Sequence, residues 1–177
     1  MFEKEKIYLS REISQDELSI LLYLRNNELY ESFYLYNLPE TTFDISRFQR
    51  KVNEGGTLYY TLRFSETKEL IGYIGLYNLN YIDRNVEIAI IVLSEYRGQG
   101  NGRRALEIIE EYCFNYLNLN KIYLSVISGN IAAYELYKKQ NYIIEGTFKN
   151  HIYKHGNYHD IIYMAKFKNG EKRYEWY

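Results

Sequence analysis

Apolar and polar residues follow two patterns along the chain, one typical of strands and one typical of helices. Short apolar runs bounded by polar turns predict six or seven strands, drawn from residues 6–12, 57–64, 69–79, 85–93, 121–127, 142–148 and 158–167. Longer segments with helical spacing predict about four helices, at residues 14–29, 43–54, 103–116 and 130–140. The polar turns "SETK" and "YIDRN" indicate that the three central strands form an antiparallel meander. We therefore expect a mixed α/β (α+β) fold in one domain spanning residues 1–177.

Two of the predicted helices carry clear local signals. Ser14 and Glu17 have the spacing of a capping box, which predicts a helix start at that point. The helix after residue 103 is amphipathic and should pack on the sheet. Its apolar side holds Ala105, Leu106, Ile109, Tyr112, Cys113 and Tyr116, and its polar side holds Arg103, Arg104, Glu107, Glu110 and Glu111.

Composition narrows the possible functions. The chain has 22 basic and 23 acidic residues and a formal net charge of -1, so no overall field attracts nucleic acid or an anionic membrane. No apolar run approaches a membrane span, and the charged start "MFEKEKIYLSRE" does not resemble a signal peptide, so we expect a cytoplasmic protein. The single cysteine, Cys113, excludes an internal disulfide. The three histidines fall in a predicted hairpin and need not share a face, so no metal site is predicted.

The stretch Arg97-Gly98-Gln99-Gly100-Asn101-Gly102 joins a predicted strand directly to a predicted helix. Glycines let backbone N–H groups approach a ligand, and a helix N-terminus adds unpaired donors that favour an anion. Arg103 and Arg104 oppose the helix dipole unless such an anion is bound, which makes a phosphate the natural ligand. The alternative is a tight turn whose glycines only relieve backbone strain.

Two common phosphate sites do not match this loop. A Walker loop requires Gly-Lys-Ser or Gly-Lys-Thr, and neither occurs in the chain. The dinucleotide fingerprint requires a glycine where Arg103 stands. Nucleoside triphosphate hydrolysis and NAD binding are therefore disfavoured.

The loop resembles the [QR]-x-x-G-x-[GA] signature of the GNAT (Gcn5-related) N-acetyltransferases. The later stretch "NIAAYELYKKQNY" resembles a second element of that family, N-x-x-A-x-x-L-Y-x-x-x-G-F, at Asn130, Ala133, Leu136, Tyr137 and Tyr142. Asn141 replaces the usual glycine, a mild change because asparagine also tolerates a left-handed helix terminus. The resemblance extends over residues 58–168.

Within the family, the chain looks closest to the ribosomal-protein and polyamine acetyltransferase branch, and it is similar to spermidine/spermine N-acetyltransferases in several segments. These segments are "VEIAIIVLSEYRGQGNG", "YCFNYLNLNKIYLSV" and "GTFKNHIYKHGNYHDIIYM".

The resemblance implies a GNAT fold, with a mixed, mostly antiparallel sheet, and a site for acetyl-CoA. The pyrophosphate would lie on the loop, and the pantetheine arm would follow the strand at residues 90–92. The residues assigned to acetyl-CoA in this way are Ile90, Ile91, Val92, Arg97, Gly98, Gln99, Gly100, Asn101, Gly102, Arg103, Asn130, Ala133, Tyr137 and Lys139.

The resemblance also implies two catalytic roles. Tyr137 would protonate the departing thiolate, and an amide at Ile91 or Val92 would polarise the thioester carbonyl. An alkylamine is protonated at neutral pH, so a base or a water wire is needed, and Glu87 is our candidate, acting directly or through water. The alternative is that Glu87 is only a solvated or salt-bridged residue of its strand. Glu28, Glu31 and Glu40 could attract a cationic amine.

The leading hypothesis is an acetyl-CoA-dependent N-acetyltransferase that acts on a small primary amine, with a polyamine as one option. Gly75 and Asn78 count against a polycation, because polyamine enzymes of this kind often place carboxylates on that strand. An amino-sugar or a protein N-terminus is the alternative acceptor, and a non-catalytic acyl-CoA-binding regulator is the alternative of another class. No nucleic-acid or membrane partner is expected, and a homo-oligomer is left open.

Overall fold

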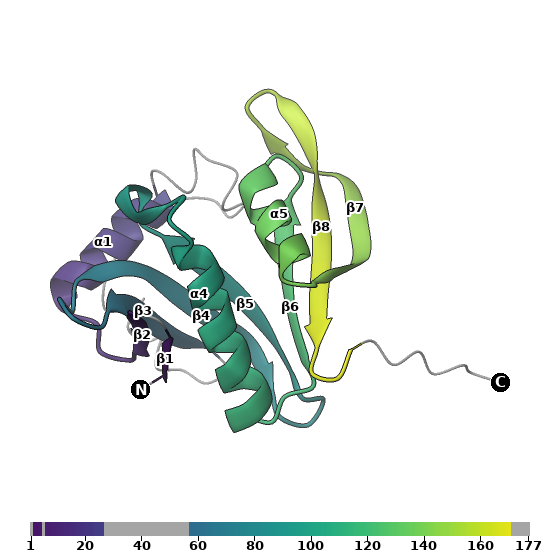
Figure 1. Cartoon of the computed structure of the whole chain (residues 1–177). Coiled ribbons are helices and arrows are strands. Elements are labelled where there is room, and N and C mark those ends of the chain that lie inside the picture. The colour runs from purple at the N-terminus through teal and green to yellow at the C-terminus, as the bar shows by residue number, and fades with distance from the viewer. Residues whose placement is uncertain (1, 5, 27–56, 171–177) are drawn as a thin grey trace.

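The computed structural model describes residues 2–4, 6–26 and 57–170 (Figure 1). In these residues, eight strands form one sheet in the order β1-β2-β3-β4-β5-β6-β8-β7. The strands are β1 (Phe2–Lys4), β2 (Ile7–Ser10), β3 (Leu58–Phe64), β4 (Leu70–Asn80), β5 (Asn85–Val92), β6 (Lys121–Ile127), β7 (Ile143–Lys154) and β8 (Asn157–Phe167). Neighbouring strands are antiparallel except β5 and β6, which are parallel. The predicted α+β class and the mostly antiparallel sheet are confirmed.

The predicted strands all occur, and β1 is an addition. Its three residues pair with β2 as an edge strand and are too few to show an alternating pattern in the sequence. The described helices are α1 (Gln15–Asn26), α4 (Asn101–Glu111) and α5 (Ile131–Lys139). A 3₁₀ turn covers Ser94–Tyr96, and α4 continues as a π-helical turn over Tyr112–Tyr116. The helix predicted at residues 43–54 lies outside the described residues.

Two apolar clusters lie on opposite faces of the sheet, because consecutive residues of β4 point to opposite sides. Ile74 belongs to the larger cluster, which α4 covers through Ala105, Leu106 and Ile109. Tyr73 belongs to the smaller cluster, which α1 covers. The larger cluster also contains Tyr137, so α4 and α5 share one face of the sheet (Figure 1).

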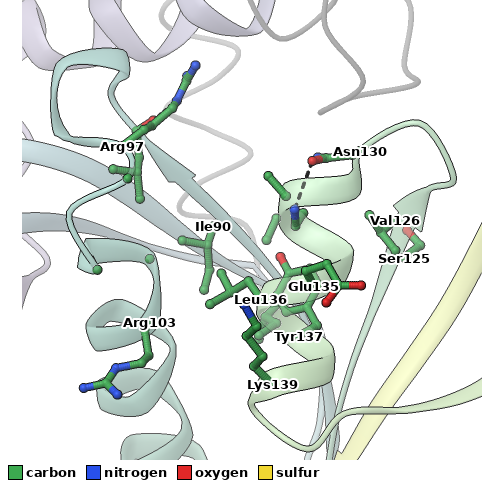
Figure 2. Close-up of a pocket in the computed structure, with 18 residues that line it drawn as sticks. Ile90, Arg97, Arg103, Ser125, Val126, Asn130, Glu135, Leu136, Tyr137 and Lys139 are labelled. Atoms are coloured by element: carbon green, nitrogen blue, oxygen red, sulfur yellow. Dashed lines mark hydrogen bonds between the residues drawn. The ribbon is translucent and has the colours of Figure 1, made fainter.

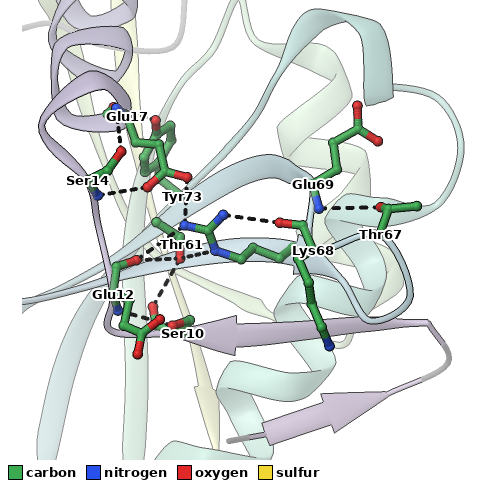
Figure 3. A network of polar contacts seen from close by, with 10 residues as sticks. Ser10, Glu12, Ser14, Glu17, Thr61, Thr67, Lys68, Glu69 and Tyr73 are labelled. Carbon is green, nitrogen blue, oxygen red and sulfur yellow. Dashed lines mark hydrogen bonds and ion pairs between the residues drawn. The ribbon is translucent and has the colours of Figure 1, made fainter.

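Polar contacts hold α1 on its face of the sheet (Figure 3). The capping box is confirmed: the Ser14 N–H donates to Glu17 Oε2 at 2.8 Å, and the Glu17 N–H donates to Ser14 Oγ at 3.2 Å. Arg63 on β3 forms an ion pair with Glu17 at 2.6 Å, and the Tyr73 hydroxyl donates to the Glu17 carbonyl at 2.6 Å. Partial burial opposes ionisation of Glu17, but the hydrogen bonds from Ser14 and Arg63 lower its pKa overall.

The polar side of α4 differs from the prediction at one position. The helical spacing predicts Glu110 on the solvent side, but only 7% of this residue is exposed, and its carboxylate accepts a hydrogen bond from Lys166 of β8. Cys113 is buried in the core, as the helical spacing indicates. Tyr116, placed on the apolar side, is 72% exposed because it lies in the π-helical turn beyond α4. No helix in the described ranges is long and apolar enough to cross a bilayer.

Candidate functional site

The site begins where the parallel pair β5 and β6 separates. These strands pair only from Asn85 with Lys121 to Glu87 with Tyr123. Beyond Glu87 the two strands diverge, and the backbone of β5 pairs only with β4 on its other side (Figure 1). This separation opens the sheet beneath α4 and α5.

A cavity of about 570 Å³ lies in this opening (Figure 2). Its lining comes from β5, the glycine loop, the start of α4, β6 and α5. The lining residues are Ile88, Ala89, Ile90, Val92, Arg97, Gly98, Gly100, Gly102, Arg103, Ser125, Val126, Asn130, Ala132, Ala133, Glu135, Leu136, Tyr137 and Lys139. Most residues assigned to acetyl-CoA from the sequence therefore lie together around one cavity.

The glycine loop turns the chain from β5 into α4. Gly98 and Gly100 have φ angles of 73° and 81°, in the left-handed region that side chains disfavour. Gly100 is the N-cap of α4, and the first turn of that helix contains no acidic residue. The N-terminus of α4 therefore lies at the cavity, with the positive end of the helix dipole and N–H groups that have no partner within the helix. No carboxylate in the first turn of the helix offsets this positive charge.

The two arginines at the start of α4 make different contacts. Arg103 lines the cavity, is mostly exposed and lies 3.6 Å from Glu107. Arg104 lies outside the cavity lining and donates to the Gln99 carbonyl at 3.0 Å. Arg104 therefore holds the loop through the Gln99 carbonyl, while Arg103 lines the cavity and pairs with Glu107 of its own helix.

Three residues assigned to acetyl-CoA lie outside the cavity lining. The Asn101 side chain is buried and donates to the Tyr96 carbonyl at 3.0 Å, and the Gln99 side chain donates to the Glu95 carbonyl at 2.9 Å. The Ile91 side chain packs on the opposite face of the sheet, against the cluster under α1. Only the backbones of these residues could serve a ligand in the cavity.

Helix α5 forms the other wall of the cavity. Asn130 is its N-cap, and its Oδ1 accepts from the Ala133 N–H at 3.1 Å (Figure 2). Tyr137 lines the cavity and is only 7% exposed. A Cβ on Gly102 would lie 3.3 Å from Leu136 Cδ2, so this glycine allows α4 to approach α5 closely.

Glu87 lies at the point where β5 and β6 separate, outside the cavity lining. By strand alternation it shares a face with Ile91, the face that α1 covers. Its Oε2 accepts from Asn78 Nδ2 at 2.9 Å. Burial, followed by the charge of Glu87, raises the pKa of the neighbouring Tyr123. Glu28, Glu31 and Glu40 lie outside the described residues.

Sequence reasoning missed several residues of the site. Ser125 and Val126 line the cavity only because β6 leaves β5, which no local pattern predicts. Ala132 and Leu136 are neighbours in sequence of Ala133 and Tyr137, and each pair is spaced by one helical turn. This spacing predicts that all four residues lie on the face of α5 that lines the cavity. Gly72 on β4 was also missed: a Cβ there would lie 2.3 Å from the Ile91 carbonyl oxygen.

Comparisons with known proteins agree with this geometry. The model of the acetyltransferase (GNAT) family matches residues 23–142. A spermidine N(1)-acetyltransferase of Vibrio cholerae is 28% identical over 165 residues, which cover 90% of this chain and 94% of that protein. A putative ribosomal N-acetyltransferase of Bacillus subtilis is 29% identical over 106 residues, 58% of each chain.

A solved structure matches over nearly the whole chain. The crystal structure of spermidine N-acetyltransferase from Vibrio cholerae in complex with CoA and spermine superimposes with a TM-score of 0.80. The two chains are 25% identical, and the match covers 93% of this chain and 97% of that one. The loop, the separated strands and the family match lead to one conclusion: this chain belongs to the GNAT family, and it is an N-acetyltransferase that uses acetyl-CoA.

Proposed function

We propose that this enzyme transfers the acetyl group of acetyl-CoA to a primary amine of a polyamine such as spermidine. The observation that carries the proposal is a single cavity that joins a helix N-terminus, a pair of separated strands and a buried tyrosine. The polyamine itself is supported by the spermidine N-acetyltransferases that match about 90% of the chain.

The residues of the loop fit the phosphates of acetyl-CoA. Gly98 and Gly100 line the cavity and have no side chain to cover their backbone N–H groups. The N-terminus of α4 favours a negative charge, and Arg103 adds a cation at the cavity wall. We assign Arg97–Arg103 to this role, mostly through backbone atoms. We assign the backbone of residues 90–92 to the pantetheine amides, because β5 has no strand partner on its cavity side there.

Bound acetyl-CoA supplies an activated thioester. An N–H of Ile91 or Val92 that faces the gap would stabilise the oxyanion, an effect worth about 3 kcal/mol for a preorganised donor. Asn130, Ala133 and Lys139 complete the wall on the α5 side.

We assign Tyr137 as the general acid that protonates the departing thiolate. It is the tyrosine of the cavity lining, and a phenol hydroxyl can donate a proton there. Glu87 would accept the proton of the ammonium through water, since it lies where the strands separate but does not line the cavity. Asn78 would hold its carboxylate by the hydrogen bond to Oε2.

An acceptor screen tests the proposal. Release of CoA thiol is measured with spermidine, spermine, a monoamine, an amino-sugar and N-terminal peptides, and acetyl-CoA binding is measured separately by calorimetry. We expect spermidine or spermine to have the highest kcat/KM. A peptide or an amino-sugar as best acceptor would overturn the polyamine assignment. Binding of acetyl-CoA without turnover of any amine would support the alternative role of an acyl-CoA-binding regulator.

A further inference from the structure

The end of α5 connects Tyr137 to a second buried tyrosine, Tyr142. Asn141 has a φ of 64°, and the N–H groups of Asn141 and Tyr142 donate to the carbonyls of Lys138 and Tyr137 at 3.1 and 3.0 Å. These two bonds form a Schellman motif, in which the residue after the left-handed position packs against the helix three residues before its cap. Tyr142 therefore meets Tyr137 through both its backbone and its side chain.

The two tyrosine rings are in direct contact. Their centroids lie 5.6 Å apart with an interplanar angle of 55°, and Tyr142 is only 3% exposed. The Tyr137 ring thus has the cavity on one side and the Tyr142 ring on another. A ring placed in this way limits the orientations available to Tyr137.

A partly buried ion pair lies beside Tyr142, and neither of its residues lines the cavity. Glu110 of α4 and Lys166 of β8 are 2.6 Å apart, and Lys166 Nζ lies 5.9 Å from the centroid of the Tyr142 ring. Burial, and then the nearby Glu110 carboxylate, raise the pKa of Tyr142. Charged groups from two different elements, α4 and β8, therefore lie near a tyrosine that contacts Tyr137.

We propose that Tyr142 is a positioning residue for Tyr137, and that the Glu110–Lys166 pair holds Tyr142 in place. The proposal rests on the role assigned to Tyr137 in the proposed function. If Tyr142 only capped α5, its replacement would affect stability and the rate independently of Tyr137. If it orients Tyr137, its effect on the rate must disappear once the Tyr137 hydroxyl is gone.

A double-mutant cycle separates these cases. The variants are Tyr142→Leu, Tyr137→Phe and the double variant, with Tyr142→Phe as the conservative control that keeps the ring. Rates are normalised to folded sites counted by acetyl-CoA calorimetry, and all assays run well below the lowest melting temperature. The acceptor is the best amine of the screen.

We expect Tyr137→Phe to lower kcat by ~10² to 10⁴ and Tyr142→Leu by ~10- to 100-fold, with acetyl-CoA affinity unchanged within a few fold. Tyr142→Phe should stay within about twofold of the parent, and the double variant within about twofold of Tyr137→Phe. Multiplicative losses in the double variant, or an unaffected Tyr142→Leu, would overturn the positioning role and leave the role of Tyr137 intact. A full kcat in Tyr137→Phe would overturn both.

A spectroscopic arm does not depend on turnover. Protein labelled with 3-fluorotyrosine gives a ¹⁹F resonance for Tyr137, which is assigned by its loss in Tyr137→Phe. We expect this resonance to shift or broaden in Tyr142→Leu and in Lys166→Met, but not in Lys149→Met, whose lysine pairs with Asp160 at the surface. An unchanged resonance in Tyr142→Leu would contradict the proposal.

Discussion

At the residue scale, Gly100 shows how one position can serve both the backbone and the ligand. Its φ of 81° allows the turn from the loop into α4, and it is the N-cap of that helix. A Cβ at this position would point toward Arg104 Nη1, 3.2 Å away. The flexible Arg104 side chain can move away from this Cβ. A side chain at position 100 is therefore unfavourable mainly because of the left-handed backbone conformation, which lowers stability, and because it occupies space that a ligand would use.

Gly100→Val should abolish measurable acetyl-CoA binding, because the left-handed conformation costs a branched residue about 1–2 kcal/mol and the side chain intrudes on the loop. Calorimetry measures the affinity, and thermal denaturation measures the stability. The control is Gly156→Val at the β7–β8 turn, where φ is 78° and no atom lies within 4 Å of the added Cβ. The control should lose similar stability and keep its affinity. Equal affinity in both variants would contradict the assignment of the loop.

At the element scale, β4 and β5 lie close together at Gly72. A Cβ built on this glycine would lie only 2.3 Å from the Ile91 carbonyl oxygen, so a side chain does not fit here without movement of the backbone. The ladder pairs Gly72 with Val92, so this contact lies beside the backbone that we assign to the pantetheine arm. A distortion here would reach the cavity through β5 itself.

Gly72→Ala should lower the free energy of unfolding by about 1–3 kcal/mol, because backbone atoms must move to admit the methyl group. It should also weaken acetyl-CoA binding, since the backbone of Ile91 would shift. Gly146→Ala on β7 is the matched control, because no atom lies within 4 Å of its added Cβ. Chemical denaturation and calorimetry measure the two effects. A Gly72→Ala protein as stable as the Gly146→Ala control would rule out this close contact.

The Glu110–Lys166 pair joins two other elements, α4 and β8. Burial raises the pKa of the Glu110 carboxyl more than the Lys166 ammonium lowers it. The folded protein therefore holds this proton to a higher pH than the unfolded chain does. Removing the ammonium takes away the largest influence that lowers this pKa and leaves burial and the Glu107 carboxylate, which raise it, against the smaller lowering effect of Tyr142. The pKa of Glu110 should therefore rise further.

Lys166→Met should cost about 2–4 kcal/mol of stability at pH 8, because it leaves a buried carboxylate without its cation. The loss should be smallest near pH 4.5 and should grow as the pH rises through the pKa of the folded state, where the buried carboxyl must ionise. Denaturant titrations from pH 4.5 to 8 test this trend. In the double variant Glu110→Gln/Lys166→Met, the pH dependence of the stability loss should vanish, because no carboxyl is left to ionise. If the loss in Lys166→Met shrinks as the pH rises, a buried carboxylate is not its cause.

At the scale of the whole molecule, the cavity lies between two parts of the sheet. Strands β1 to β5 and strands β6 to β8 are joined by the short parallel ladder that ends at Glu87 and Tyr123. Helix α4 lies over the first part and α5 over the second, and residues of both helices line the cavity (Figure 1). A ligand in the cavity contacts both parts and should stabilise the junction.

Acetyl-CoA at 100 times its Kd should therefore add about 2.7 kcal/mol to the stability, which corresponds to a rise in Tm of about 5–10 °C for a chain of this size. Differential scanning calorimetry measures the shift. Pantetheine, which lacks the pyrophosphate, should produce a much smaller shift at the same concentration. Equal shifts for the two ligands would argue against the phosphate role of the loop.

The sequence by itself determined the features that depend on neighbouring residues. The capping box at Ser14 and Glu17, the loop with Gly98 and Gly100 at left-handed φ, and the helix end at Asn141 all occur where the pattern predicts them. These features rest on backbone preferences and hydrogen bonds within a few residues, so the local sequence contains the information that specifies them.

Only the tertiary structure decided the features that depend on residues far apart in the chain. The end of the β5–β6 ladder at Glu87 opens the cavity, Lys166 draws Glu110 into the interior, and the Ile91 carbonyl requires a glycine at position 72. The periodicity of α4 placed Glu110 on its solvent side, because periodicity describes one helix and carries no information about the strand that packs against it. Where strands separate and which buried charges meet depend on packing between elements, which no local pattern records.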